Sequence, residues 1–86
     1  MTDTTTTTET IATELDCSGL LCPLPVYKAA LVLNQLGQGD RLRLTTTDPG
    51  ALRDIPAMAK QRGDKLVEVI DEENRQIFLL EKGVGK

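Results

Sequence analysis

The chain has 86 residues and a formal net charge of −3, and it contains no histidine. A chain of this length forms one domain, because two independent cores would need more residues. Apolar residues make up 40% and charged residues 27%, which is typical of a folded rather than a disordered protein. The lack of histidine excludes Cys-His and Ser-His catalysis and His-ligated metal sites. The negative charge argues against nucleic acid as a primary ligand.

The amino-terminal stretch is rich in threonine and lacks the basic start and apolar run of a secretion signal. We interpret residues 1–10 as a flexible tail, 11–83 as a single domain and 84–86 as a short C-terminal tail. No apolar run reaches the roughly 20 residues that cross a bilayer, so we expect a cytoplasmic protein without membrane contact. Cys17 and Cys22 are then reduced thiols, too few for a closed zinc site, so we expect no metal and no cofactor.

The first half of the chain predicts a strand followed by a helix. Apolar and polar residues alternate from Ile11 to Leu15, which predicts a short strand, and a turn follows at Ser18-Gly19. Apolar residues at helical spacing predict a helix from Cys22 to about Leu36. Gly37 then ends that helix in the manner of a glycine C-cap.

A second strand and a second helix follow. Residues 41–47 alternate and predict the strand. Asp48 is a good N-cap and Pro49 suits the first helical position, so a helix is expected to start there and to end near Gly63. Pro56 lies inside this helix, where we expect a kink or a short break.

The last part of the chain predicts a hairpin. Residues 65–71 and 76–82 have the composition of strands, and the polar segment 72–75 joins them as an antiparallel turn. The element order is therefore β-α-β-α-β-β. Right-handed crossovers place both helices on one face of a four-stranded mixed sheet. We therefore assign the α+β class, as a two-layer α/β sandwich.

The motif that carries chemistry is Cys22-Pro23-Leu24-Pro25, at the start of the first predicted helix. We place Cys22 at the N-cap, with its thiol facing the N–H groups of Leu24 and Val26 at the positive end of the helix dipole. This setting lowers the pKa of a thiol and makes a thiolate nucleophile without any histidine. The supporting helix start comprises Pro23, Leu24, Pro25 and Val26. The structural alternative is that Cys22 is a small buried core residue.

The sequence around this motif resembles the TusA/SirA family of small sulfur carriers, whose hallmark is Cys-Pro-x-Pro after a Gly-containing turn. Residues 15–25 match that signature, and Thr47-Asp48-Pro49-Gly50-Ala51 is similar to the family's second-helix opening. The similarity covers residues 12–82. It implies the same two-layer fold, and it implies that Cys22 accepts a sulfane sulfur as a persulfide and passes it to a partner protein.

The resemblance also implies the kind of partners. They are a sulfur-donor protein, such as a cysteine desulfurase or a rhodanese, and a sulfur-acceptor protein. In some family members the sulfur reaches 2-thiolated uridine in tRNA, and in others it serves molybdenum cofactor assembly or the oxidation of reduced sulfur compounds. The chain is then a sulfurtransferase-type carrier within a relay rather than a free-standing turnover enzyme. We expect a monomer, because one cysteine must reach successive partners.

Three further residues have both a structural and a functional interpretation. Cys17 is either inert at the end of the first strand or a resolving thiol that attacks a Cys22 persulfide. Asp48 is either an N-cap only or a carboxylate that tunes Cys22. Lys28 is either solvated or a contact for an anionic donor or an acidic partner. Two other functions stay open: a non-catalytic protein- or RNA-binding regulatory module, and a dithiol redox protein that uses both cysteines.

Overall fold

The structure, a computed structural model, describes residues 13–21 and 23–83. The predicted tails at 1–10 and 84–86, and Ile11 at the start of the first predicted strand, lie outside these residues. Within them, no helix is long and apolar enough to cross a membrane. The elements follow the predicted order: β1 (Thr13–Cys17), α1 (Leu24–Gln35), β2 (Arg41–Thr46), α2 (Ala51–Arg62), β3 (Lys65–Asp71) and β4 (Gln76–Glu81).

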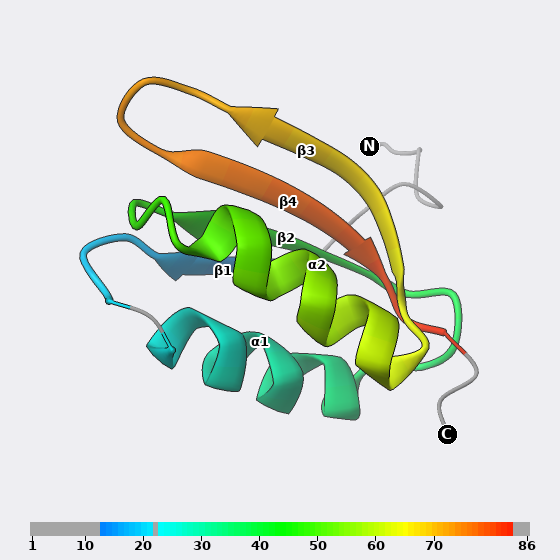
Figure 1. Cartoon of the computed structure of the whole chain (residues 1–86). Coiled ribbons are helices and arrows are strands. Elements are labelled where there is room, and N and C mark those ends of the chain that lie inside the picture. The colour runs from blue at the N-terminus through cyan, green and yellow to red at the C-terminus, as the bar shows by residue number, and fades with distance from the viewer. Residues whose placement is uncertain (1–12, 22, 84–86) are drawn as a thin grey trace, which may run out of the picture.

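The strands form one mixed sheet in the order β1-β2-β4-β3. β1 and β2 are parallel, whereas β4 pairs antiparallel with both β2 and β3. Both helices cover the same face of this sheet (Figure 1). The predicted two-layer α+β architecture is therefore confirmed, with the hairpin folded so that its second strand lies next to β2.

Buried and more exposed side chains alternate along β2, which explains why the core lies on one face of the sheet. In β2, Leu42, Leu44 and Thr46 are buried toward the helices, and Leu44 lies opposite Phe78 of β4. Side chains that alternate along a strand point to opposite faces of the sheet, so one face becomes apolar. The buried apolar cluster comprises Cys17, Ala29, Leu33, Leu42, Leu44, Ala51, Ile55, Met58, Ala59, Phe78 and Leu80.

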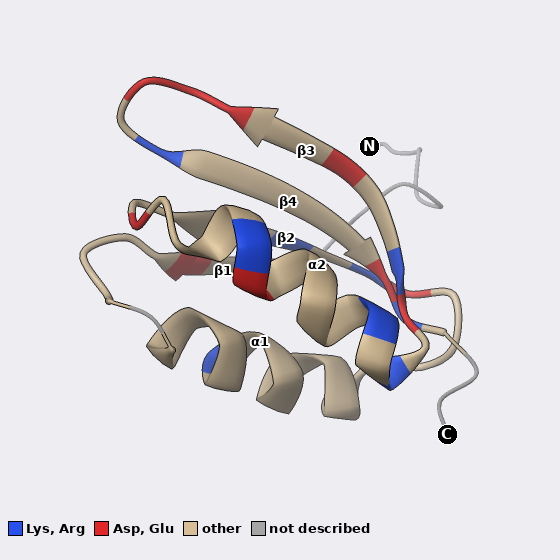
Figure 2. Ribbon diagram, viewed as in Figure 1, with Lys and Arg blue, Asp and Glu red and all other residues tan. Residues whose placement is uncertain are grey.

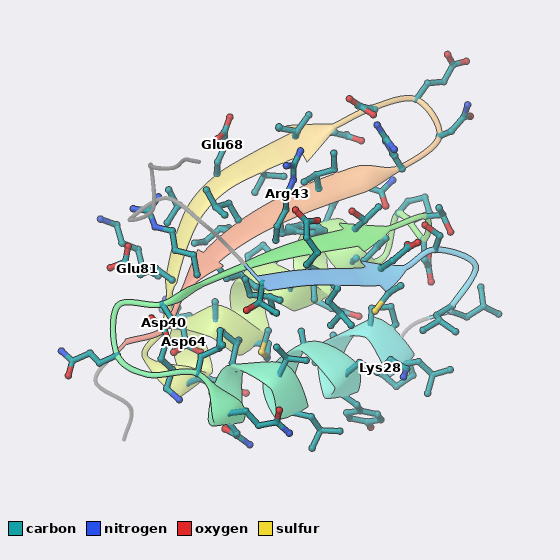
Figure 3. All side chains as sticks on the ribbon, turned by 180° about the vertical axis from the view of Figure 1, so that it is seen from behind. Lys28, Asp40, Arg43, Asp64, Glu68 and Glu81 are labelled. Atoms are coloured by element: carbon teal, nitrogen blue, oxygen red, sulfur yellow. The ribbon has the colours of Figure 1, made fainter. Side chains whose placement is uncertain are left out.

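The face of the sheet away from the helices is lined with paired charges. Arg41 forms an ion pair with Glu81 at 3.1 Å, and Arg43 approaches Glu14 at 3.8 Å. Arg43 and Glu81 are visible on this side of the sheet in Figure 3. Each of these two arginines has a carboxylate close by, so the positive charges on this face are paired rather than clustered.

The carboxyl end of α1 differs from the glycine C-cap predicted for it. The helix ends at Gln35, and its C-cap is Leu36 in an extended conformation. The Lys82 ammonium donates to the carbonyl oxygens of Leu33 at 2.6 Å and Leu36 at 3.3 Å. A lysine from the end of the sheet thus satisfies carbonyl groups that a helix leaves without intrahelical partners.

α2 passes through Pro56 as one helix from Ala51 to Arg62, so of the predicted kink or short break the break is wrong. It ends as predicted, because Gly63 has a φ of 83°, in the left-handed region that glycine adopts without steric cost. β3 contains an irregularity between Leu66 and Glu68 in its pairing with β4. Such bulges are common in edge strands.

Candidate functional site

Both helices begin at the same edge of the sheet. β1 and β2 are parallel and each leads into a helix, so the carboxyl ends of both strands lie beside the first turns of α1 and α2 (Figure 1). The chain passes from Leu21 to Pro23 at this edge, and Cys22 itself lies outside the described residues. The described residues on either side of the candidate nucleophile, Leu21 and Pro23, therefore lie at the edge that holds the positive ends of two helix dipoles.

The loop before the cysteine is held by its own side chains and by the neighbouring loop. The Asp16 carboxylate accepts hydrogen bonds from the Ser18 N–H at 3.0 Å and the Ser18 hydroxyl at 2.6 Å. These bonds lower the pKa of Asp16. The Gly19 N–H donates to the Thr47 hydroxyl at 2.8 Å, and Gly19 has a φ of 80°. The loops after β1 and after β2 are therefore tied together, which fixes one side of the site.

The first helix starts one residue later than predicted. Its N-cap is Pro23 rather than Cys22, and no side chain caps it. The Leu24 N–H is not free for a thiol, because it donates to the Leu21 carbonyl at 2.9 Å. Pro25 is buried, and Val26 is partly buried against the core. Pro23 thus belongs to a turn that precedes the helix, and the buried Pro25 anchors the first turn of the helix itself.

The second helix starts two residues later than predicted, with Gly50 as its N-cap and no side chain that caps it. The Asp48 carboxylate accepts the Gly50 N–H at 3.0 Å. N–H groups of Ala51 and Leu52 donate to carbonyls three residues earlier, which makes a tight turn before the regular helix. Asp48 therefore holds the turn that precedes α2, and the prediction that it is the N-cap of this helix is wrong.

Sequence reasoning missed a buried polar pair beside this edge. Thr46 is fully buried and Gln76 is 4% exposed. Three acceptors surround one end of the Gln76 amide, namely the Thr46 hydroxyl at 2.9 Å, the Thr46 carbonyl at 3.3 Å and the Asp48 carbonyl at 3.2 Å, so we assign that end as the nitrogen, which donates to them. This pair connects β4 to the start of the β2–α2 loop. Thr46 and Gln76 are 30 residues apart in the sequence, so no local sequence pattern predicts their contact.

The second cysteine of the chain is part of the core. Cys17 is fully buried in the apolar cluster at the end of β1. Burial raises the pKa of its thiol, while the positive charge of Lys28 opposes that rise. Lys28 projects from the first part of α1, near the edge where β1 ends (Figure 3). A neutral, enclosed thiol is a poor nucleophile, which supports the inert interpretation of Cys17.

The structure places some of the predicted site residues at one edge of the sheet and buries another one in the core. Asp48, Lys28 and the flanks of Cys22 lie at the edge where the helices start, whereas Cys17 lies beneath it in the core. Among the described residues, no three Cys, Asp or Glu side chains gather as metal ligands do. The chemistry that the described residues bring to this edge therefore consists of two helix starts, the Lys28 ammonium, and the Asp16 and Asp48 carboxylates, which are both engaged in local hydrogen bonds.

Comparison with known proteins gives a consistent result. A family model described as "Sulfurtransferase TusA" matches residues 13–82. The chain is 45% identical over 69 residues to "Sulfur carrier protein TusA" of Allochromatium vinosum, covering 80% of this chain and 91% of that protein. It is 38% identical over 69 residues to YrkI of Bacillus subtilis, covering 80% and 92%. A SirA-like protein from Desulfitobacterium hafniense has the same fold, with a TM-score of 0.72, 22% identity, and coverage of 81% and 96%.

Proposed function

Because the chain belongs to the TusA sulfurtransferase family and is a sulfur carrier protein, we propose that Cys22 is the residue that holds the sulfur, as a persulfide. The observation that carries this proposal is the position of its flanks: Leu21 and Pro23 lie at the edge where both helices start. The positive ends of the helix dipoles favour an anionic sulfur there. Cys17, the other thiol, is enclosed in the core.

The transfer needs no base and no redox cofactor. The Cys22 thiolate attacks the outer sulfur of a donor persulfide, a new sulfur–sulfur bond forms, and the donor's inner sulfur leaves as a thiolate. In the second half-reaction an acceptor thiolate attacks the outer sulfur on Cys22, and the Cys22 thiolate leaves. The same electrostatic setting favours both steps, because a thiol of low pKa is a better leaving group.

The carrier role requires two protein partners in turn. The donor is a protein that bears a persulfide, such as a cysteine desulfurase or a rhodanese, and the acceptor is a second protein with a reactive thiol. We place the relay in the cytoplasm, where thiols are kept reduced. The carrier acts as a monomer, so that the same sulfur is presented first to one partner and then to the other.

Mass spectrometry after exposure to a persulfide donor tests the assignment. The wild-type protein is expected to gain one sulfur atom on the peptide that contains Cys22, and Cys22→Ser is expected to gain none. Cys17→Ala is the matched control, because it removes the other thiol and leaves Cys22 in place. Sulfur gain by Cys22→Ser, or no gain by wild type with any donor, would contradict the proposal.

The two alternative functions predict different results in the same experiment. A dithiol redox protein would form an internal disulfide and lose activity when Cys17 is replaced, yet full burial of Cys17 disfavours that attack. A non-catalytic binding module would retain its function in Cys22→Ala. Sulfur transfer that requires Cys22 and tolerates Cys17→Ala separates the carrier from both.

A further inference from the structure

The outer side of α1 and the loop before it expose a row of large apolar side chains. Leu21 is 71% exposed, Tyr27 61% and Leu31 62%, and Leu24 lies between Leu21 and Tyr27 at 47%. We call these residues, together with Lys28, the α1 stripe. Positions 24, 27, 28 and 31 are separated by three or four residues and therefore share one side of the helix. Leu21 adjoins them through its hydrogen bond with the Leu24 N–H.

The fold does not require this row. α1 already contributes Pro25, Ala29 and Leu33 to the core from its opposite side. Of the six large apolar residues that the described part of the chain exposes, four belong to the α1 stripe, and the other two, Val69 and Ile70, lie on β3. Exposed apolar side chains that gather on one face, rather than being scattered singly, mark interaction surfaces.

The charge on this surface indicates what covers it. Lys28 is the sole charged residue of α1, whose sequence is LPVYKAALVLNQ, and Figure 2 shows one basic position and no acidic one on that helix. A second copy packed stripe against stripe would bring two ammonium groups close together with no carboxylate on either helix. A partner surface that is apolar and carries a carboxylate complements both the apolar side chains of the stripe and the positive charge of Lys28.

The stripe is continuous with the candidate site. Leu21 and Leu24 stand on either side of the Cys22-Pro23 pair in the chain, so a protein that covers the stripe contacts residues on both sides of the cysteine in the sequence. We propose that the α1 stripe is the docking surface for the sulfur-donor protein, whose contact surface is apolar and carries a carboxylate opposite Lys28. This inference rests on the proposed carrier function of Cys22. It assigns Tyr27 and Leu31 a role in docking and no role in the sulfur-transfer reaction itself.

Sulfur donors of two kinds, proteins and a small molecule, separate the effect of docking from the effect of the chemical step. The protein donors are purified cysteine desulfurase charged with L-cysteine and purified persulfidated rhodanese, both from the same cells as the carrier, and the small donor is glutathione persulfide. Tyr27→Ser and Leu31→Ser are expected to slow sulfur transfer from a protein donor roughly tenfold, as truncation of a buried interface anchor does. Their sulfur uptake from glutathione persulfide is expected to stay at the wild-type rate. Ile70→Ser, which removes an exposed apolar side chain on β3, is the matched control and should affect neither rate.

Lys28 supplies an electrostatic test of the same surface. If Lys28 attracts a carboxylate of the donor, the wild-type transfer rate decreases as the salt concentration rises. Lys28→Glu is expected to slow transfer from the protein donor and to remove this salt dependence. Lys28→Arg is expected to keep the wild-type rate and the wild-type salt dependence. Unchanged protein-donor rates in the Tyr27 and Leu31 variants would overturn the inference, as would a wild-type dimer that Leu31→Ser dissociates. Uptake by wild type from glutathione persulfide but from neither protein would also overturn it, while leaving the proposed function intact. Absence of uptake from every donor would instead refute the proposed function.

Discussion

The two cysteines show how much the environment of a single residue decides. Cys17 closes the end of β1 and is fully buried among apolar side chains, whereas the flanks of Cys22 lie at the edge where both helices start. Burial disfavours the charged form of a thiol, and helix starts favour it. Two thiols five positions apart in the chain therefore serve different purposes, one in packing and one in the proposed chemistry.

Cys17 should make the stability of the protein depend on alkaline pH. Because burial raises the pKa of its thiol, the folded state holds this proton more tightly than the unfolded state does. The resulting stabilisation is complete below the ordinary thiol pKa of 9.0 and is lost as the pH rises through the higher folded-state value. Urea unfolding between pH 7 and 10, in a Cys22→Ser background, should show a steeper loss of stability with Cys17 than with Cys17→Ala. Parallel pH profiles would show that the burial has no such effect.

At the scale of elements, the ends of the helices are completed by other parts of the chain. The turn before α2 is held by Asp48, and the carboxyl end of α1 by Lys82 from beyond β4. These contacts fix how each helix lies on the sheet. They also explain why the predicted boundaries differ from the observed ones, because a boundary depends on the groups that receive the terminal N–H and carbonyl hydrogen bonds.

Lys82→Met should destabilise the protein by about 1–2 kcal/mol, because it removes a charged donor from carbonyl groups at the negative end of a helix. The methionine retains most of the apolar stem. Lys65→Met, at an exposed position on β3, is the matched control and should change the free energy of unfolding by less than about 0.5 kcal/mol. Chemical denaturation of both variants measures the difference, and equal effects would show that the Lys82 contacts contribute nothing.

At the scale of the molecule, the strand order divides the sheet into a protected centre and two edges. β2 and β4 are hydrogen-bonded on both sides, whereas β1 and β3 each have one neighbouring strand. The centre also holds the largest buried side chains, including Phe78, Leu42 and Leu44. Opening of the centre therefore requires loss of the core, while the edges can open locally.

Hydrogen exchange followed by mass spectrometry should resolve this division. Amides of β2 and β4 are expected to exchange at least roughly tenfold more slowly than those of β3, because local opening of an edge strand costs less than global unfolding. Fraying of β3 is also favoured by its irregular pairing near Leu66. Equal protection in β3 and β4 would indicate that the hairpin opens only with the whole domain.

The sequence by itself determined the element order, the two-layer class, the motif cysteine and the family, because periodicity, turn residues and short motifs are properties of neighbouring residues. It predicted Gly63 as a helix end, which the structure confirms, and Asp48 as the N-cap of α2, where the structure has Gly50 instead. It placed the first residue of each helix too early and predicted a break at Pro56 that is absent.

Only the tertiary structure decided the position of β4 between β2 and β3, the full burial of Cys17, the Thr46–Gln76 pair and the exposure of the α1 stripe. Each of these depends on segments far apart in the chain. The Lys82 ammonium contacts a carbonyl 49 residues away, and the two loops at the site are joined across 28 residues. The free energy of such contacts depends on how helices and sheet pack together, and no local sequence pattern encodes that packing.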